Sequence, residues 1–154
     1  MTIFVGLTGG IATGKSTVVK FLQKKGYKVH DSDLVVNKIY SKPNKKLFDT
    51  LKKIGLSKSI KNKKIDKSII RDEIFSNKVK KKKLEKFIHK EVRISRSLFI
   101  KKYKNKKNKI IFFDIPLLFE SKLTHICHYI ILLCAPKKTK IERVLKRKNI
   151  DKKT

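Results

Sequence analysis

The sequence feature that most constrains this chain is the run Gly9–Ser16, which satisfies the pattern G-x-x-x-x-G-K-[ST]. Before it, Thr2–Leu7 is apolar and β-branched and leads into glycines, which predicts a strand buried on both faces. After it, Ser16–Lys25 carries apolar residues at helical spacing and is followed by Gly26, which predicts a helix. Strand, glycine loop and helix in this order indicate a phosphate-binding loop; the alternative is a chance match.

Each residue that the pattern requires has a physical role in binding a polyphosphate. Glycines let the backbone turn successive N–H groups inward, and the positive end of the following helix favours the same anion. Lys15 supplies a charge that can follow the β- and γ-phosphates, and the Ser16 hydroxyl is suited to ligate Mg²⁺. The predicted nucleotide-binding residues are Gly10, Ile11, Ala12, Thr13, Gly14, Lys15, Ser16 and Thr17, the last toward the α-phosphate.

The remaining apolar patterns predict an α/β fold, with a parallel sheet wrapped by helices on both faces. Further strands are expected at Tyr27–His30, a short one, at Ile110–Phe113, which reads as buried, and at Tyr129–Cys134. A final helix follows Pro136, with Ile141, Val144 and Leu145 expected to point inward. Between them lie Lys-rich helical patterns without a convincing strand. We therefore predict a core in two parts, 1–40 and 109–147, with a helical insertion at 41–108.

Three aspartates stand at the ends of the second and third predicted strands, where open α/β sheets place their ligands. A carboxylate there can orient or deprotonate an attacking hydroxyl, or hold Mg²⁺. For Asp33 we favour such a role, although Ser32 or Asp33 could instead cap the helix expected at Leu34–Tyr40. For Asp114 we also favour a role at the metal or acceptor over that of a turn residue. For Asp31, a functional role and a structural role as a cap or turn residue both remain open.

The net charge is +30, from 42 Lys plus Arg against 12 Asp plus Glu, and by itself favours nucleic acid or an anionic membrane as partner. Only five of these residues are arginine, the residue that geometry-specific phosphate and base recognition uses most, and the lysines are spread along the chain. We interpret the charge as background composition and expect no membrane partner and no specific nucleic acid. A basic nucleic-acid-binding protein remains the alternative from another class.

Cellular location is predicted from two further features of the 154-residue chain. No stretch approaches the roughly 18 consecutive apolar residues of a membrane span. Two cysteines, Cys127 and Cys134, are too few for a disulfide framework and fit a reducing cytoplasm.

Taken together, the motifs resemble those of the dephospho-coenzyme A kinase family. The matching segments are Thr8–Thr17 (TGGIATGKST), His30–Asp33 (HDSD), Arg71–Asn77 (RDEIFSN), His89 and Asp114–Glu120 (DIPLLFE). The resemblance implies a P-loop kinase fold similar to that of nucleoside monophosphate kinases. It also implies transfer of the ATP γ-phosphoryl group to the 3′-hydroxyl of dephospho-coenzyme A, the last step of coenzyme A biosynthesis, with Mg²⁺.

The resemblance further implies roles for individual residues. Asp33 matches the proposed base on the 3′-hydroxyl, and Lys15 and Asp114 complete the catalytic set. Arg143 and Arg147 resemble the beginning of a lid over ATP, which residues 148–154 would continue. The implied acceptor-binding residues are Asp31, Arg71, His89, Pro116, Leu117, Phe119 and Glu120. A structural role remains open for His89, and core packing remains open for the apolar members of the set and for Leu118.

The chain departs from the family pattern in three ways. Ala12 replaces a usual glycine, which we expect the loop to tolerate, and Lys90 stands where proline often follows the histidine. The family is usually longer, so the rest of the lid, a last strand and a closing helix are expected to be missing. Tyr129–Cys134 would then be an exposed apolar edge, in a monomer or weak self-associate.

The missing lid leaves the activity open, because closure over the substrate excludes water and completes the catalytic site. The loop could bind nucleotide while turnover is weak or absent. The alternatives are therefore another small-molecule or nucleoside monophosphate kinase, or a nucleotide-binding pseudoenzyme.

Overall fold

The computed structural model describes residues 1–106 and 109–146. Contacts divide the chain into two compact units: residues 1–32 together with the described part of 101–154, and residues 33–100. Arg147 and the expected start of the lid at 148–154 lie outside the described residues.

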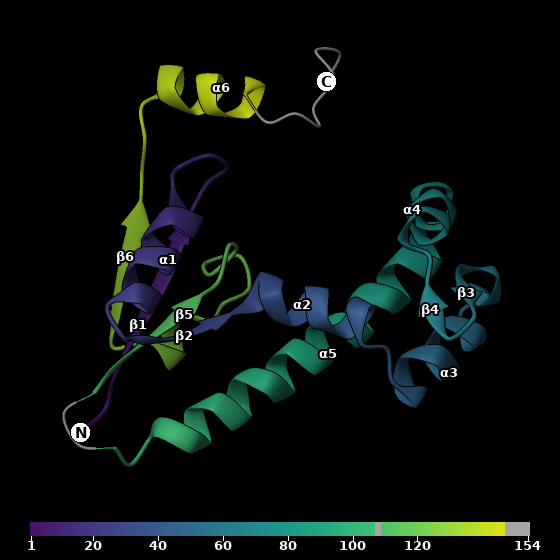
Figure 1. Ribbon diagram of the computed structural model, residues 1–154, viewed down its shortest axis with the longest axis horizontal. Coiled ribbons are helices and arrows are strands. Elements are labelled where there is room, and N and C mark those ends of the chain that lie inside the picture. The colour runs from purple at the N-terminus through teal and green to yellow at the C-terminus, as the bar shows by residue number, and fades with distance from the viewer. Residues whose placement is uncertain (107–108, 147–154) are drawn as a thin grey trace. The chain divides into compact units, whose positions relative to one another are not determined.

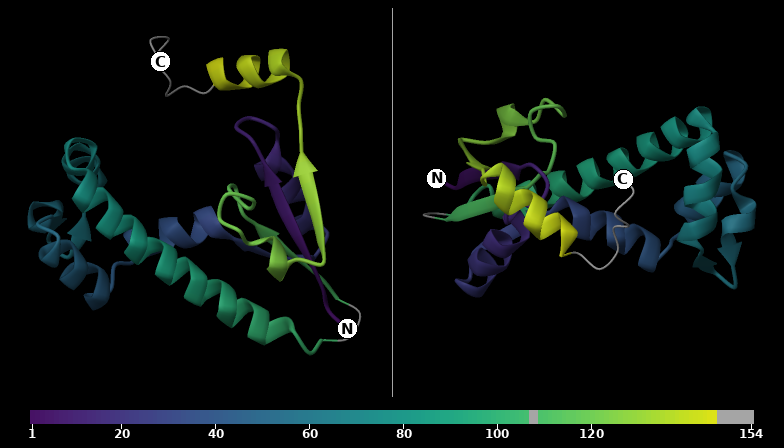
Figure 2. Two further views of the ribbon diagram at one scale, coloured as in Figure 1. Left: turned by 180° about the vertical axis from the view of Figure 1, so that it is seen from behind. Right: turned by 90° about the horizontal axis from the view of Figure 1, so that it is seen from above.

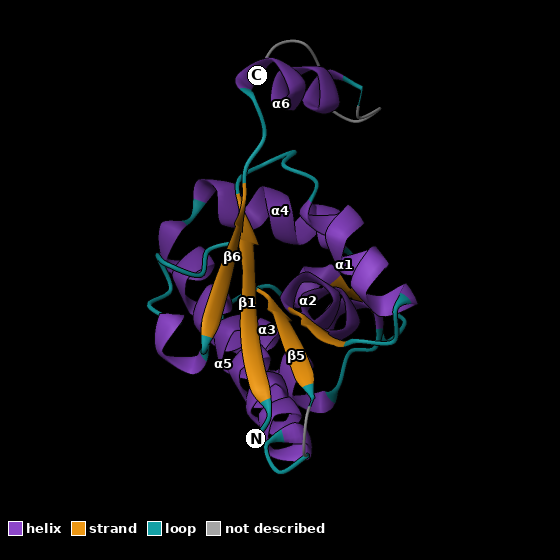
Figure 3. Ribbon diagram, turned by 90° about the vertical axis from the view of Figure 1, so that its left-hand side faces the viewer, coloured by secondary structure: helices purple, strands orange, loops and turns teal. Residues whose placement is uncertain are grey.

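The first unit is built on a four-stranded parallel sheet with strand order β2-β5-β1-β6 (Figure 3). Its strands are β1 (Ile3–Gly9), β2 (Lys28–Asp31), β5 (Ile110–Asp114) and β6 (Tyr129–Leu133). The two central strands, β1 and β5, are buried along nearly their whole length, as the apolar runs predicted. Leu7 of β1 and Asp31 of β2 both lie in register with Asp114 of β5, so the sheet aligns its carboxyl ends at one edge.

Both faces of β1 are covered. On one face lies helix α1 (Lys15–Lys24), whose Val19 packs with Val5, Leu7 and Phe112. On the other face lies the segment that follows β5, which contains the fully buried Leu118 and a short 3₁₀ turn, η2 (Thr124–Ile126). The α/β class with helices flanking a parallel sheet is therefore confirmed.

Gly6 allows the segment after β5 to approach β1 closely. A Cβ at this position would lie 2.6 Å from Leu118 Cδ1 and 2.9 Å from Cys127 Sγ, both far too short for real contacts. Since Leu118 is fully buried, it has little room to move away. The absence of a side chain at position 6 thus fixes how the residues beyond Asp114 lie on the sheet.

Among the strands of the described residues, β6 forms one edge of the sheet, as predicted, with Tyr129, Ile131 and Leu132 exposed. In the helix after it, α6 (Lys137–Leu145), two of the three residues predicted to point inward do not: Ile141 and Leu145 are 49% and 59% exposed, while Val144 is half-buried. Figure 2 shows α6 standing clear of the sheet, so the described residues offer these side chains little to pack against. The helical pattern was therefore correct, whereas the expected burial of its apolar face is not seen for these two side chains.

The second unit is mainly helical, with α2 (Ser32–Ser41) leading into it and α5 (Lys78–Tyr103) leading out (Figure 1). Helices α3 (Lys45–Lys53) and α4 (Lys67–Ser76) and the 3₁₀ turn η1 (Ser57–Ser59) complete its helices. Their apolar stripes meet in one core, formed by Leu47, Leu51, Leu56, Ile70, Leu84 and Ile88. The helical character of this region was predicted from those stripes.

A small hairpin in this unit was not predicted. Strands β3 (Ile60–Lys61) and β4 (Lys64–Ile65) pair antiparallel, and the connecting Asn62 and Lys63 have φ values of +48° and +59°. Two left-handed residues at this place are typical of a tight hairpin turn. Strands of two residues are too short to display an alternating pattern, so the sequence does not predict a strand here.

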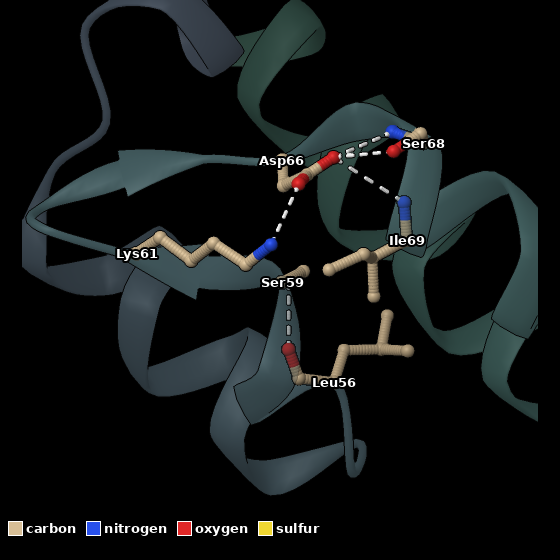
Figure 4. Close-up of polar contacts among 6 residues, drawn as sticks. All are labelled: Leu56, Ser59, Lys61, Asp66, Ser68 and Ile69. Atoms are coloured by element: carbon tan, nitrogen blue, oxygen red, sulfur yellow. Dashed lines mark hydrogen bonds and ion pairs between the residues drawn. The ribbon is translucent and has the colours of Figure 1, made fainter.

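Asp66 joins this hairpin to α4 (Figure 4). Its carboxylate accepts hydrogen bonds from the Ser68 hydroxyl at 2.6 Å, from the Ser68 and Ile69 amides at 3.1 and 3.4 Å, and from Lys61 Nζ at 3.2 Å. The Ser68 hydroxyl, followed by Lys61, lowers the pKa of Asp66 from 3.8 to about 2. Asp66 therefore acts as the N-cap of α4 in its ionised form.

We expect Asp66→Ala to lower the thermal stability at neutral pH. Because the folded-state pKa lies below the unfolded value, the carboxylate contributes stability above that value and loses it as the pH falls toward about 2. The difference in melting temperature between variant and wild type, followed by circular dichroism, should therefore shrink on acidification through this range. Asp72→Ala, which removes an exposed carboxylate from the same helix, is the control. Equal effects of both variants at every pH would contradict the cap.

Candidate phosphate-binding site

The glycine-rich loop runs from the end of β1 at Gly9 to the start of α1 at Lys15 (Figure 1). A Cβ on Gly9 would lie 2.6 Å from the Leu133 carbonyl oxygen and 2.9 Å from Thr13 Oγ1, so only glycine fits there. The Thr13 hydroxyl donates to the Gly10 carbonyl at 2.9 Å, which holds the loop folded on itself. Gly14, with φ of +96°, turns the chain into the helix, as the motif requires.

Lys15 and Asp114, predicted as catalytic residues from positions 99 apart in the chain, are in direct contact. Lys15 Nζ donates to Asp114 Oδ1 at 2.5 Å, and the two side chains are only 12% and 5% exposed. Ser16 and Thr17 follow in the first turn of α1 with exposed side chains. The amide groups of that first turn have no partner within the helix and carry its positive dipole end. The arrangement can hold a multiply charged anion.

The position of Asp114 is fixed by hydrogen bonds just beyond it. The Ile115 amide donates to the Leu7 carbonyl at 3.0 Å, and the buried Thr8 hydroxyl donates to the Pro116 carbonyl at 2.9 Å. Thr8 was not among the predicted site residues. A polar residue at the end of an apolar strand was the signal that could have found it, since a buried hydroxyl needs a partner.

The segment after Asp114 separates into buried and exposed side chains. Leu118 is fully buried, so core packing is the correct reading for this residue. Leu117 and Phe119 are 59% and 51% exposed, Glu120 is exposed and Pro116 is half-buried. Leu117 and Phe119 therefore form an apolar surface rather than part of the core.

Arg143 of α6 reaches back to the phosphate loop. Its Nη1 donates to the Ala12 carbonyl at 3.0 Å and lies 3.6 Å from where a Cβ on Gly14 would stand. From the residue pattern alone, without the family resemblance, Arg143 would be predicted to be an ordinary surface charge. It adds a second cation beside the loop, in addition to Lys15.

The other predicted residues fall into two groups. Asp31, at the end of β2, lies beside Asp114 in the sheet and is half-buried. Asp33, Arg71 and His89 belong to the second unit, on α2, α4 and α5, and all three are exposed. His89 is therefore not a core histidine.

The alternative in which Ser32 or Asp33 caps the second helix does not match the helix start in the structure. Helix α2 already begins at Ser32, directly after β2, so both residues lie inside its first turn. An acidic side chain in that turn still complements the positive end of the helix.

A resident metal site is not formed by side chains alone. The described residues contain no group of three His, Cys, Asp or Glu side chains that could hold a metal ion. Magnesium is commonly bound by one or two carboxylates together with substrate phosphates and water. The Ser16 hydroxyl and the Asp114 carboxylate fit a Mg²⁺ ion that arrives with a nucleotide.

A parallel sheet whose central strand leads through a glycine-rich loop into a helix, with a lysine–aspartate pair at that loop, defines a phosphate-loop nucleotide-binding fold. The family model described as dephospho-CoA kinase matches residues 3–154. The chain belongs to the dephospho-CoA kinase family.

Individual relatives agree with this assignment. A dephospho-CoA kinase from Fusobacterium nucleatum is 37% identical over 151 residues, covering 97% of this chain and 76% of the relative. Among solved structures, the dephospho-CoA kinase from Campylobacter jejuni superposes with a TM-score of 0.68 at 31% identity, over 98% of this chain and 75% of that one. TT1252 from Thermus thermophilus gives a TM-score of 0.74 at 28% identity, over 97% and 74%. This chain spans about three quarters of the length of these proteins.

No helix within residues 1–106 and 109–146 combines the length and the apolar character that crossing a membrane requires.

Ala12 offers a test of the loop conformation, because its φ is +59°. A left-handed conformation costs alanine about 1–2 kcal/mol, and glycine avoids this at an entropic cost of roughly 0.5–1 kcal/mol. We therefore expect Ala12→Gly to be neutral or to stabilise by up to about 1 kcal/mol in urea unfolding. The other alanine, Ala135, has no positive φ, so Ala135→Gly should be neutral or destabilising. A clear loss of stability in Ala12→Gly alone would contradict the strained loop.

Proposed function

We propose that this chain transfers the γ-phosphoryl group of ATP to the 3′-hydroxyl of dephospho-coenzyme A, giving coenzyme A and ADP. Membership of the dephospho-CoA kinase family supports this activity. The observation that carries it is the contact of Lys15 with Asp114 at the mouth of the phosphate loop, since the two groups that the reaction uses are already side by side. The folded loop and the nearby Arg143 support ATP as the phosphoryl donor.

In the proposed reaction the bond from the γ-phosphorus to the β,γ-bridging oxygen breaks, and a bond to the acceptor oxygen forms. Negative charge moves onto the bridging oxygen, where the loop amides and Lys15 stabilise it. Arg143 adds positive charge beside the loop. Arg147 is proposed to add a further positive charge at the nucleotide. The proton of the acceptor hydroxyl passes to Asp33, which acts as the general base.

Magnesium is part of the proposal. The Ser16 hydroxyl and the Asp114 carboxylate would hold the ion together with phosphate oxygens. When bound, it supplies positive charge that neutralises the phosphates during transfer.

For the acceptor we propose residues of the insertion and, separately, residues of the segment after β5. Arg71 is suited to pair with a phosphate of dephospho-coenzyme A, and His89 and Asp31 belong to the same set. The exposure of Leu117 and Phe119 supports a binding surface there, because large apolar side chains are otherwise buried. Pro116 and Glu120 complete this wall, and a cytoplasmic location is proposed from the two free cysteines.

A panel of acceptors tests the assignment. With ATP and Mg²⁺ we expect phosphorylation of dephospho-coenzyme A and not of nucleoside monophosphates, measured by ADP release. Lys15→Ala should lower kcat by about 10²–10³, as for the loss of one transition-state contact, while Lys20→Ala, an exposed lysine of the same helix, should not.

Each alternative has its own outcome in this panel. Phosphorylation of another acceptor instead would identify a different kinase, and ATP binding without turnover would identify a pseudoenzyme. Nucleic-acid binding that weakens steeply with salt and ignores Lys15→Ala would favour the basic binding protein.

The role of Asp33 is tested separately. If it accepts the hydroxyl proton, Asp33→Asn should lower kcat by about 10²–10⁴ with little change in KM for ATP. Asp49→Asn, an exposed acid of the same unit, is the control and should keep wild-type kcat. A kcat for Asp33→Asn close to that of the control would remove Asp33 from the chemistry.

A further inference from the structure

A surface hollow of the second unit lies between helix α3 and the hairpin of β3 and β4 (Figure 1). Its volume is about 430 Å³, within the range of about 300–1,000 Å³ that small-molecule sites occupy. We propose that it binds a small organic anion, a molecule whose apolar chain or ring ends in a phosphate or another acidic group. The hollow is lined by Lys45, Phe48, Asp49, Lys52, Ile60 and Lys63, none of which takes part in the proposed function.

The packing of α3 determines which of its side chains face the hollow. Leu47 and Leu51 are fully buried in the core of the second unit. Residues three and four apart share one face of a helix, so Lys45, Phe48 and Lys52 lie together on a face beside the two leucines. The same packing that folds the unit therefore presents these three side chains to the hollow.

The hairpin that forms the other wall is held against the same core. Ile60 and Ile65 pair across the hairpin, and both pack on the core. Just beyond the strands, the Asp66 amide donates to the Ser59 carbonyl at 2.8 Å. Ile60 and the turn residue Lys63 are thereby positioned at the hollow before any ligand binds. Binding to a wall that is already formed costs less ordering of the protein.

The hollow combines an apolar surface with an excess of positive charge. Phe48 and Ile60 are half-buried and supply the apolar surface, and three exposed lysines and one aspartate surround them. Within the described residues no ion pair joins any of these three lysines to an acid, whereas the neighbouring Lys61 is paired with Asp66. A ligand with both an apolar part and a negative charge satisfies both features, and inorganic phosphate satisfies only the second.

Lys63 occupies a position of the turn that does not favour lysine. Its φ is +59°, and that of Asn62 before it is +48°. Two-residue hairpin turns with this geometry prefer Asn followed by Gly, because glycine adopts a positive φ without strain. Residues held in such conformations cluster at functional places. The side chain found where glycine is preferred is one of the three ammonium groups at the hollow.

Calorimetric titration of the full chain with n-octyl phosphate tests the site, with inorganic phosphate in excess to occupy the phosphate loop. We expect saturable binding of octyl phosphate under these conditions. Lys63→Gly should weaken this binding about tenfold through the loss of one charge-assisted contact. It should not lower the melting temperature, because glycine suits the turn. Lys64→Ala is the matched control, since it removes the same charge from the adjacent residue of β4.

A fluorescent reporter tests the apolar part of the site, because the chain contains no tryptophan. In Phe48→Trp we expect octyl phosphate to shift the emission to shorter wavelength, since the alkyl chain excludes water from the ring. Phe21→Trp is the control: Phe21 is an exposed ring of α1 with Lys25 beside it, and it belongs to the first unit.

Three outcomes overturn the proposal. The first is the absence of saturable octyl phosphate binding in wild type. The second is equal weakening by Lys63→Gly and Lys64→Ala, which would mean that only the net charge matters. The third is an equal emission shift in the two tryptophan variants. If Phe48→Trp does not fold, the titration of the two lysine variants decides.

Discussion

The parallel pairing of β1 with β5 is the constraint on which the rest of the site depends. It sets Leu7 against Asp114, so the loop that follows β1 and the carboxylate that ends β5 emerge at the same edge of the sheet. The register of the two strands is strongly specified, because a slip of one residue would turn every side chain of the strand to the opposite face of the sheet. The buried, β-branched character of both strands, together with helix α1 on one face, holds that register in place.

From this pairing follows the electrostatic character of the site. Two cations, Lys15 and Arg143, and the amino end of α1 surround a loop that carries no acidic side chain. The carboxylate that ends β5, Asp114, is held by the lysine itself. Lysines are spread along the whole chain, but it is the fold that brings these particular positive groups together at the phosphate loop.

Local patterns made much of this predictable. The phosphate loop and the central strands were visible in the sequence, because each depends on residues close together in the chain. The exposed edge at β6 was expected only from the comparison with the longer family. What the sequence could not supply was contact between distant residues. The roles of Thr8 as a tie to Pro116, and of Asp114 as the partner of Lys15, arise only when β1 and β5 pair.

The wrong predictions have a similar origin. An apolar stripe on α6 indicates a helix but does not say what covers it, and the hairpin at β3 and β4 depends on two left-handed residues, Asn62 and Lys63, that no periodic pattern announces. The alternative of a cap at Ser32 or Asp33 does not hold, because β2 passes into α2 without a loop. Site roles within the second unit rest on the family resemblance and stay predictions.

The missing side chain at Gly6 links three positions that are far apart in the sequence. Because Leu118 and Cys127 fill the space a Cβ would need, substitutions at these three places are not independent. Among relatives, an alanine at position 6 should be accompanied by a smaller residue at position 118 or 127. The side chains at positions 6, 118 and 127 share one fixed space, so a larger side chain at one of them requires a smaller one at another.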